Sequence, residues 1–266
     1  MSFRPSTTQS PIVYGADPAS YHALGSEFKA GDPRRVMSRS QLQRFSKCPA
    51  KWIRSAESDD ETSAMEFGSL VDTCVTMPER FEAIYALAPE QYPTKGMECP
   101  VCKSVTDSAR CMKCKVPRVE VDVLKDWNWA STTCQEWREE RQKLGKTVVK
   151  STTASEAWKA AARLREDEEI GSILAVSAKQ VCVNVDWHDV TGVVVPVKCM
   201  LDLVPDPASE FGDSLWDLKC PNDCDPVFWA KYIFNWKLHY QGAMYLDAIN
   251  AAGSAGSRDP APGRRP

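Results

Sequence analysis

Two aspartates and a lysine lie on consecutive β-branched segments in the last third of the chain. Asp202 comes near the end of "TGVVVPVKCMLDLVP", and Asp217 and Lys219 lie in "SLWDLKC". The period of two along a strand puts Asp217 and Lys219 on one face. Side chains on adjacent strands lie about 5 Å apart, so Asp202 and Asp217 could share a cation. Because Mg²⁺ takes hard oxygen ligands, the pattern predicts a magnesium site.

A lysine beside such a cation has a chemical use. Lys219 can orient or deprotonate an attacking water, or stabilise charge that develops on a phosphate. The cation itself polarises a phosphoryl oxygen and lowers the pKa of bound water. Taken alone, Asp217 and Lys219 indicate no more than a salt bridge at the end of a strand. Asp202 on the neighbouring segment shifts the balance towards a metal site without deciding it.

A second constellation is made of cysteines. The stretch "CPVCKSVTDSARCMKC" contains Cys99, Cys102, Cys111 and Cys114 as two C-x-x-C pairs separated by eight residues. Four thiolates complete a tetrahedral Zn²⁺ site with no open position for catalysis. The pattern therefore predicts structural zinc that folds a short segment, and redox-active or incidental cysteines are the alternatives.

Basic residues surround these cysteines. They either contact a DNA backbone or form a solvated loop. The residues are Lys103, Arg110, Lys113, Lys115 and Arg118.

The remaining sequence predicts the elements that position these residues. A Ser-capped stretch at 38–55 reads as a helix that Pro49 breaks or restarts. We expect further helices at 65–76, 131–145, 152–168 and 226–250, a loop at 79–95, and strands at 179–187, 191–205 and 214–220, the first two forming a hairpin. The order predicts an α/β (α+β) fold with a central mixed sheet flanked by helices.

Composition limits the function classes. The 266 residues carry a net charge of only −3, so a nucleic-acid surface has to be a local patch. No apolar run is long enough to span a bilayer, and the N-terminus lacks the apolar core of a signal peptide. We therefore expect a cytoplasmic protein without membrane contact, whose 11 cysteines are not a disulfide framework.

Four motifs in order resemble one family. "SRSQLQRFSKCPAKW", "FGSLVDTCVTMPERFEAIYAL", the pair "TGVVVPVKCMLDLVP" and "LWDLKC", and "HYQGAMYLD" with its Q-x-x-x-Y spacing are similar to the PD-(D/E)XK nuclease superfamily. The RecB-like branch is the nearest match, and within it the phage RecE-like exonucleases of the exodeoxyribonuclease VIII type. The likeness implies a restriction-endonuclease-like core at 37–250, with a zinc-binding insertion at 96–117, a flexible arm at 1–36 and a disordered tail at 251–266.

The resemblance also implies an activity and its residues. It implies a DNA exonuclease that hydrolyses linear DNA with Mg²⁺ or Mn²⁺, in phage-type recombination or repair inside a bacterial host. Asp202, Asp217 and the backbone carbonyl of Leu218 would bind the metal, and Lys219 would be the catalytic lysine. Gln241 and Tyr245 would lie near the DNA and brace the site. DNA is the implied partner, with a single-strand annealing protein and self-association as further expectations.

The sequence departs from the family pattern at two positions. Asp72 stands where the family has a metal-binding histidine, and its oxygens could still reach the metal. Gln180 stands near the place where a glutamate often precedes the hairpin. The absent histidine and a short segment after the Q-x-x-x-Y helix favour an alternative, a catalytically weakened DNA-binding module with structural zinc. An unrelated metal-dependent hydrolase is a third possibility, against which the Gln241 and Tyr245 spacing argues.

Overall fold

The computed structural model describes residues 2–6, 10–29, 32–54, 63–188, 190–221 and 223–253. The chain divides into two compact units. Unit 1 comprises Met1–Met77 and Ala161–Pro266, and unit 2 comprises Pro78–Ala160. The aspartates of the predicted magnesium site belong to unit 1, and the four cysteines belong to unit 2.

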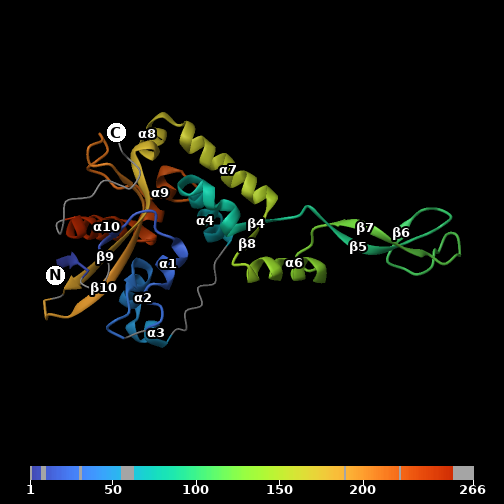
Figure 1. The fold of residues 1–266 in the computed structure, drawn as a ribbon, viewed down its shortest axis with the longest axis horizontal. Coiled ribbons are helices and arrows are strands. Elements are labelled where there is room, and N and C mark those ends of the chain that lie inside the picture. Colours follow the sequence, from blue (N-terminus) through green and yellow to red (C-terminus); the bar gives the residue numbers. More distant parts are fainter. Residues whose placement is uncertain are drawn as a thin grey trace. The chain divides into compact units, whose positions relative to one another are not determined.

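A mixed sheet forms the centre of unit 1. Its two long strands, β9 (Ser177–His188) and β10 (Val194–Pro205), form the predicted antiparallel hairpin. On the outer side of β9 lie β1 (Ser2–Pro5) and β2 (Ile12–Val13), both antiparallel to it. On the other side, β3 (Met37–Ser38) pairs parallel with β10. Helices flank this sheet (Figure 1), so the predicted α/β class with a mixed sheet is confirmed.

The core of unit 1 follows from alternation along the hairpin. Alternate residues in the middle of β9 and β10, from Val181 to Val185 and from Val197 to Leu201, are small or branched apolar side chains. These pack with α10 (Leu238–Gly253), on which small residues allow close approach. The fully buried members from the two strands are Val181, Val183, Val185, Val197, Cys199 and Leu201, and α10 contributes Ala248, Ile249 and Ala252.

The first predicted helix is confirmed as a pair, α2 (Arg39–Lys47) and α3 (Pro49–Arg54). Ser38 caps α2 in a capping box: its backbone N–H donates to Gln41 Oε1 over 3.1 Å, and its hydroxyl accepts from the Gln41 N–H. The chain then restarts at Pro49, because proline suits the first turn of a helix, where no N–H is needed.

The other predicted helices are also present. In unit 1 they are α4 (Ser63–Thr76), α9 (Pro226–Asn235) and α10. Unit 1 also contains α8 (Glu168–Val176), which was not predicted. In unit 2, α6 (Thr132–Lys143) matches its prediction, and α7 (Ser151–Glu166) begins there. No helix among the residues that the structure describes is long and apolar enough to cross a membrane.

The strand predicted at 214–220 is absent. Only Trp216 pairs with β10, exchanging two backbone hydrogen bonds of 3.1 Å with Leu203. The next N–H that could extend the ladder, that of Leu218, donates instead to the carboxylate of Asp202 over 2.7 Å. A side chain therefore takes the place of a ladder partner, and the segment continues as an extended loop.

Two further predictions are wrong. The described part of 1–36, expected to be a flexible arm, contains β1, β2 and the helix α1 (Pro18–Ala23), because pairing with β9 gives this polar stretch backbone partners. The loop expected at 79–95 contains η1 (Pro78–Arg80), α5 (Phe81–Ile84), β4 (Tyr85–Ala88) and the start of β5 (Gln91–Glu98). The tail predicted at 251–266 lies mostly outside the described residues.

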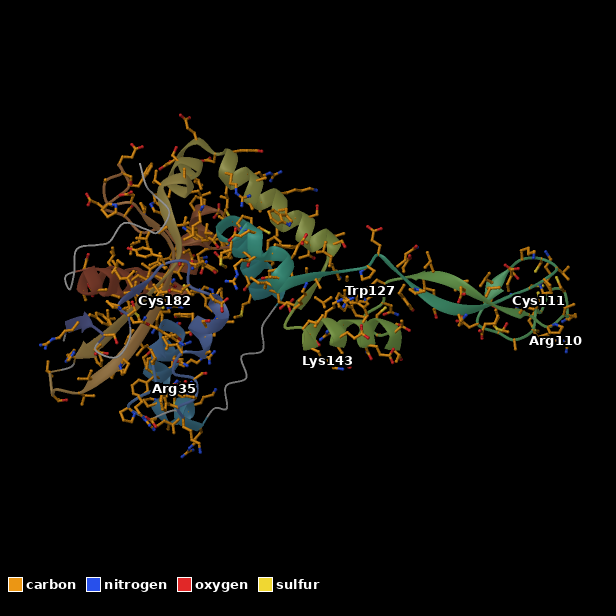
Figure 2. The ribbon with its side chains drawn as sticks, in the orientation of Figure 1. Arg35, Arg110, Cys111, Trp127, Lys143 and Cys182 are labelled. Carbon is orange, nitrogen blue, oxygen red and sulfur yellow. The ribbon has the colours of Figure 1, made fainter. Side chains whose placement is uncertain are left out.

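In unit 2 the cysteine insertion belongs to a longer hairpin. β5 pairs antiparallel with β7 (Val119–Asp126) and with the short β6 (Val105–Thr106). Cys111 and Arg110 lie at the far end of this hairpin, and Trp127 lies at its other end (Figure 2). There Trp127 packs edge-to-face on Trp129 and Trp137. A parallel pair, β4 with β8 (Thr147–Lys150), completes the unit.

Candidate active site and four-cysteine centre

The residues predicted around Asp217 lie together. The Lys219 ammonium forms an ion pair with Asp217, and it also donates to the Leu218 carbonyl over 3.2 Å. Leu218 in turn donates its N–H to Asp202. Alternation in the extended loop is therefore enough to put Asp217 and Lys219 side by side, although the segment is not a strand.

Helix α10 supplies the next two predicted residues. Gln241 is buried and donates from Nε2 to Asp217 Oδ1 over 3.1 Å. Tyr245, one turn later, lines the same cavity as Asp217 and Leu215. Burial raises the pKa of Tyr245 well above 10, and the nearby Asp217 and Asp202 carboxylates add to that shift. The tyrosine is thus a neutral hydroxyl beside two carboxylates.

Asp72 of α4 joins the site through Gln180 of β9. Gln180 donates from Nε2 to Asp72 Oδ2 over 2.8 Å, whereas Asp72 Oδ1 is buried without a hydrogen-bond partner. A buried carboxylate oxygen without a donor is costly, and a cation is one partner that would satisfy it.

Gln180 also has an unusual backbone. Its φ is +50°, a left-handed conformation that side chains other than glycine rarely adopt. The pairs Leu201 with Val181 and Leu203 with Lys179 flank it, so Gln180 lies opposite Asp202 at a point where the ladder skips a pair. Such strain costs about 1–3 kcal/mol and is concentrated at functional sites.

The three carboxylates repel one another. Burial raises the pKa of Asp202 well above its ordinary value, and Asp217 and Asp72 raise it further. Burial also raises the pKa of Asp72 to about 6, and the hydrogen bond from Gln180 and the charge of Lys219 only partly oppose this. A divalent cation among these groups would remove the repulsion.

The donor chemistry therefore fits a hard divalent cation. Asp72, Asp202, Asp217 and the Leu218 carbonyl offer oxygen atoms, which Mg²⁺ prefers. Among the described residues, however, only the cysteine group has three or more side-chain ligand atoms that all lie within 4.8 Å of one another. The aspartate oxygens are more widely spaced than that.

Three basic residues near the site were not predicted. Arg39, Arg44 and Lys198 line a second cavity that also includes Gln241 and Tyr245. The sequence carried a signal for the arginines, because 33–56 contains seven Lys or Arg and no Asp or Glu. Lys198 is a charged residue in the buried part of β10. Its ammonium donates to the carbonyls of Tyr21 and Leu24 near the end of α1.

The four cysteines form a compact group. The sulfur atoms of Cys99, Cys102, Cys111 and Cys114 all lie within 4.8 Å of one another, so the group could hold a structural metal such as zinc. Contact with the Ser104 hydroxyl lowers the pKa of the Cys102 thiol to about 6, whereas the contact with Cys102 raises the pKa of the Cys114 thiol to about 12.

The two C-x-x-C pairs have the same backbone pattern. The Cys99 N–H donates to the Ser104 carbonyl over 3.0 Å, and the Cys111 N–H donates to the Val116 carbonyl over 2.9 Å. In each turn the lysine after the second cysteine is left-handed, with φ of 56° at Lys103 and 59° at Lys115. The turns are therefore two copies of one knuckle.

Most basic groups around the knuckles have partners within unit 2. The Arg110 guanidinium donates to the Lys115 carbonyl, and that of Arg118 donates to the carbonyls of Met97 and Ser104. Lys103 forms an ion pair with Glu98 over 3.1 Å. These contacts brace the turns. They do not distinguish between the two expectations for the basic residues, contact with a DNA backbone and a solvated loop.

Comparison of the chain with known protein families, curated proteins and solved structures found no match. Its function therefore has to be argued from the arrangement of its own residues.

Proposed function

We propose that the protein is a metal-dependent nuclease of the PD-(D/E)XK type with a restriction-endonuclease-like core, acting on linear DNA. The observation that carries the proposal is the meeting of Asp72, Asp202, Asp217, Lys219 and Gln241. These residues come from α4, β10, the following loop and α10, and hydrogen bonds or mutual electrostatic effects connect them. Three carboxylates and a lysine, with an amide holding one carboxylate, are the groups that metal-assisted phosphodiester hydrolysis uses.

Each residue has a role in this proposal. Asp72, Asp202, Asp217 and the Leu218 carbonyl would hold Mg²⁺ or Mn²⁺, which when bound polarises a phosphoryl oxygen and lowers the pKa of water. Lys219 forms an ion pair with Asp217 and would supply positive charge to a phosphate that gains negative charge in the reaction. Gln241 fixes the orientation of Asp217 by its hydrogen bond.

The basic segment 33–56 supplies the local patch that the near-neutral chain needs for DNA. Arg44, Lys47, Lys51 and Arg54 of α2 and α3 are exposed, and Arg39 and Arg44 line the cavity that contains Gln241 and Tyr245. Neutralisation of backbone phosphates by such residues would provide most of the affinity for DNA. In unit 2, we assign zinc to the four cysteines, with a structural role.

Digestion of linear duplex DNA with Mg²⁺ tests the proposal. We expect Asp217→Asn and Lys219→Met to lower the rate at least about a hundredfold, a size typical of losing a group that stabilises transition-state charge. Glu210→Gln is the matched control, because Glu210 is an exposed carboxylate in the loop between β10 and Asp217. Degradation that is equal in all variants would refute the assigned site.

A second candidate is a DNA-binding module without catalysis. The spacing of the aspartate oxygens and the presence of Gln180 rather than a carboxylate favour it. Wild-type protein that binds linear DNA but degrades neither linear nor circular DNA with Mg²⁺ or Mn²⁺ would establish this candidate and refute the first.

A further inference from the structure

Unit 1 exposes a group of aromatic side chains where α9 meets α10. We call Phe234, Trp236, His239 and Tyr240 the aromatic platform. Phe234, Trp236 and Tyr240 are 74%, 56% and 64% exposed, and His239 is also exposed. Large rings gathered at the surface have no role in the core, and they mark a surface that binds another molecule.

The rings of the platform contact one another, and one of them also contacts a partly buried ring. Phe234 stacks on His239 with an interplanar angle of 14°, and the His239 and Tyr240 ring centroids are 4.4 Å apart. Trp236 contacts the partly buried Tyr232. These ring contacts restrict the orientations of the Phe234, Trp236 and Tyr240 rings in the free protein.

The charge around the platform is positive. Residues 226–246 contain Lys231 and Lys237 and no Asp or Glu. The Lys237 ammonium lies 5.8 Å from the centre of the Tyr240 ring. Arg39 donates to the carbonyls of Trp236 and Lys237, so one arginine of the basic segment lies beside the platform. A ligand suited to this surface combines flat apolar groups with negative charge.

We propose that the aromatic platform binds single-stranded nucleic acid, with bases stacked on Phe234, Trp236 and Tyr240 and phosphates near Lys237. Sequence-tolerant stacking on aromatic side chains beside basic groups is how proteins hold single strands. The inference rests on the proposed function, because Gln241, which bonds to Asp217, directly follows Tyr240. The N–H groups of Tyr240 and Gln241 both donate to the Lys237 carbonyl, so one platform residue and one site residue share the first turn of α10.

A second copy of the chain is a less suitable occupant. Pairing of identical surfaces about a twofold axis places the same patch of both copies in one interface. The four lysines, Lys231 and Lys237 of each copy, would then share that interface without a carboxylate from 226–246 to neutralise them. A polyanion meets the same surface without that repulsion.

The test measures binding apart from cleavage. The full-length Asp217→Asn protein, with its zinc retained and no chelator present, is titrated against a labelled oligo(dT) of about 12 nucleotides, within the usual site size. Phe234→Ala and Trp236→Ala should each weaken binding about tenfold, the loss expected for one stacked base. Phe234→Leu should weaken it as well, because leucine keeps apolar area but has no ring, whereas Trp236→Phe should retain most of the affinity.

Several outcomes would overturn the inference. The first is unchanged oligo(dT) binding in Phe234→Ala and Trp236→Ala, and the second is full oligo(dT) affinity in Phe234→Leu. The third is a wild-type dimer in sedimentation that the Phe234→Ala substitution dissociates without altering oligo(dT) affinity. The wild-type digestion assay is independent of this test. If the platform substitutions weaken oligo(dT) binding but the wild type does not digest DNA, only the nuclease proposal is refuted. If the wild type digests DNA but the platform substitutions leave oligo(dT) binding unchanged, only the platform proposal is refuted.

Discussion

At the scale of single residues, one buried oxygen atom of the site has no hydrogen-bond partner. Asp72 Oδ1 is buried without a partner, while Oδ2 is held by Gln180. Gln180 makes that contact from a left-handed backbone at the ladder position opposite Asp202. A strained residue that supports a carboxylate with an unsatisfied oxygen is more consistent with a binding role than with a role in stability.

The substitution Gln180→Glu tests this arrangement. Without divalent cations it should lower the free energy of unfolding by about 1–3 kcal/mol, because a donor to Asp72 is replaced by a second carboxylate. With Mg²⁺ the added ligand should increase the rise in unfolding temperature above that of the wild type. Thermal unfolding with and without Mg²⁺ measures both effects.

Gln180→Met is the control for that experiment. It removes the donor without adding a ligand, so it should lower stability and leave the response to Mg²⁺ no larger than in the wild type. A weaker Mg²⁺ response in Gln180→Glu than in the wild type would contradict the placement of the cation.

At the scale of elements, the knuckles of unit 2 show how short turns substitute for a core. Each turn is closed by backbone hydrogen bonds around its first cysteine, and each requires a left-handed residue after its second cysteine. The chain uses Lys103 and Lys115 there, although glycine adopts this conformation without steric cost. The sulfur group therefore has to stabilise a backbone that the lysines disfavour.

Substitutions at Lys115 should separate the effect of backbone conformation on zinc affinity from the effect of the lysine charge. Lys115→Gly should keep or improve zinc affinity, because it relieves a left-handed conformation that costs a non-glycine residue about 1–2 kcal/mol. Lys115→Val should weaken zinc binding at least about tenfold, because a β-branched side chain fits this conformation worst. Competition against a chromogenic chelator measures both. Lys113→Val, at an exposed neighbour without a left-handed backbone, should leave affinity unchanged; an equal loss there would show that charge is responsible.

At the scale of the whole molecule, the chain has two cores of different kinds. Unit 1 is organised by the β9–β10 hairpin against α10, which Figure 1 shows as the long strands with the C-terminal helix. The far end of the unit 2 hairpin contains the cysteine group, and the tryptophans lie at its other end (Figure 2). We therefore expect the two units to unfold separately, each with its own free energy of unfolding.

Zinc removal tests this division. Cys111→Ser should release zinc and abolish hydrogen-exchange protection across 98–118, because that stretch has no other core. Amides of β9 and β10 should keep their protection. Cys134→Ser, which alters a buried cysteine of α6 outside the group, should retain zinc and the protection of 98–118. Loss of protection throughout the chain in Cys111→Ser would show a single cooperative unit.

The sequence by itself determined the local features of this protein. The caps and proline of 38–54, the β9–β10 hairpin, the last two helices and the spacing of the four cysteines were all readable, because each depends on neighbours along the chain. The residue types around Asp217 were readable for the same reason.

Only the tertiary structure decided which distant groups meet. It placed β1 and β2 on β9, diverted the Leu218 N–H from a strand ladder to Asp202, and brought Gln180 to Asp72. It also set Arg39 against the turn between α9 and α10, beside the exposed rings. These outcomes depend on which partner satisfies a buried donor or acceptor, and that choice is made between segments far apart in the sequence.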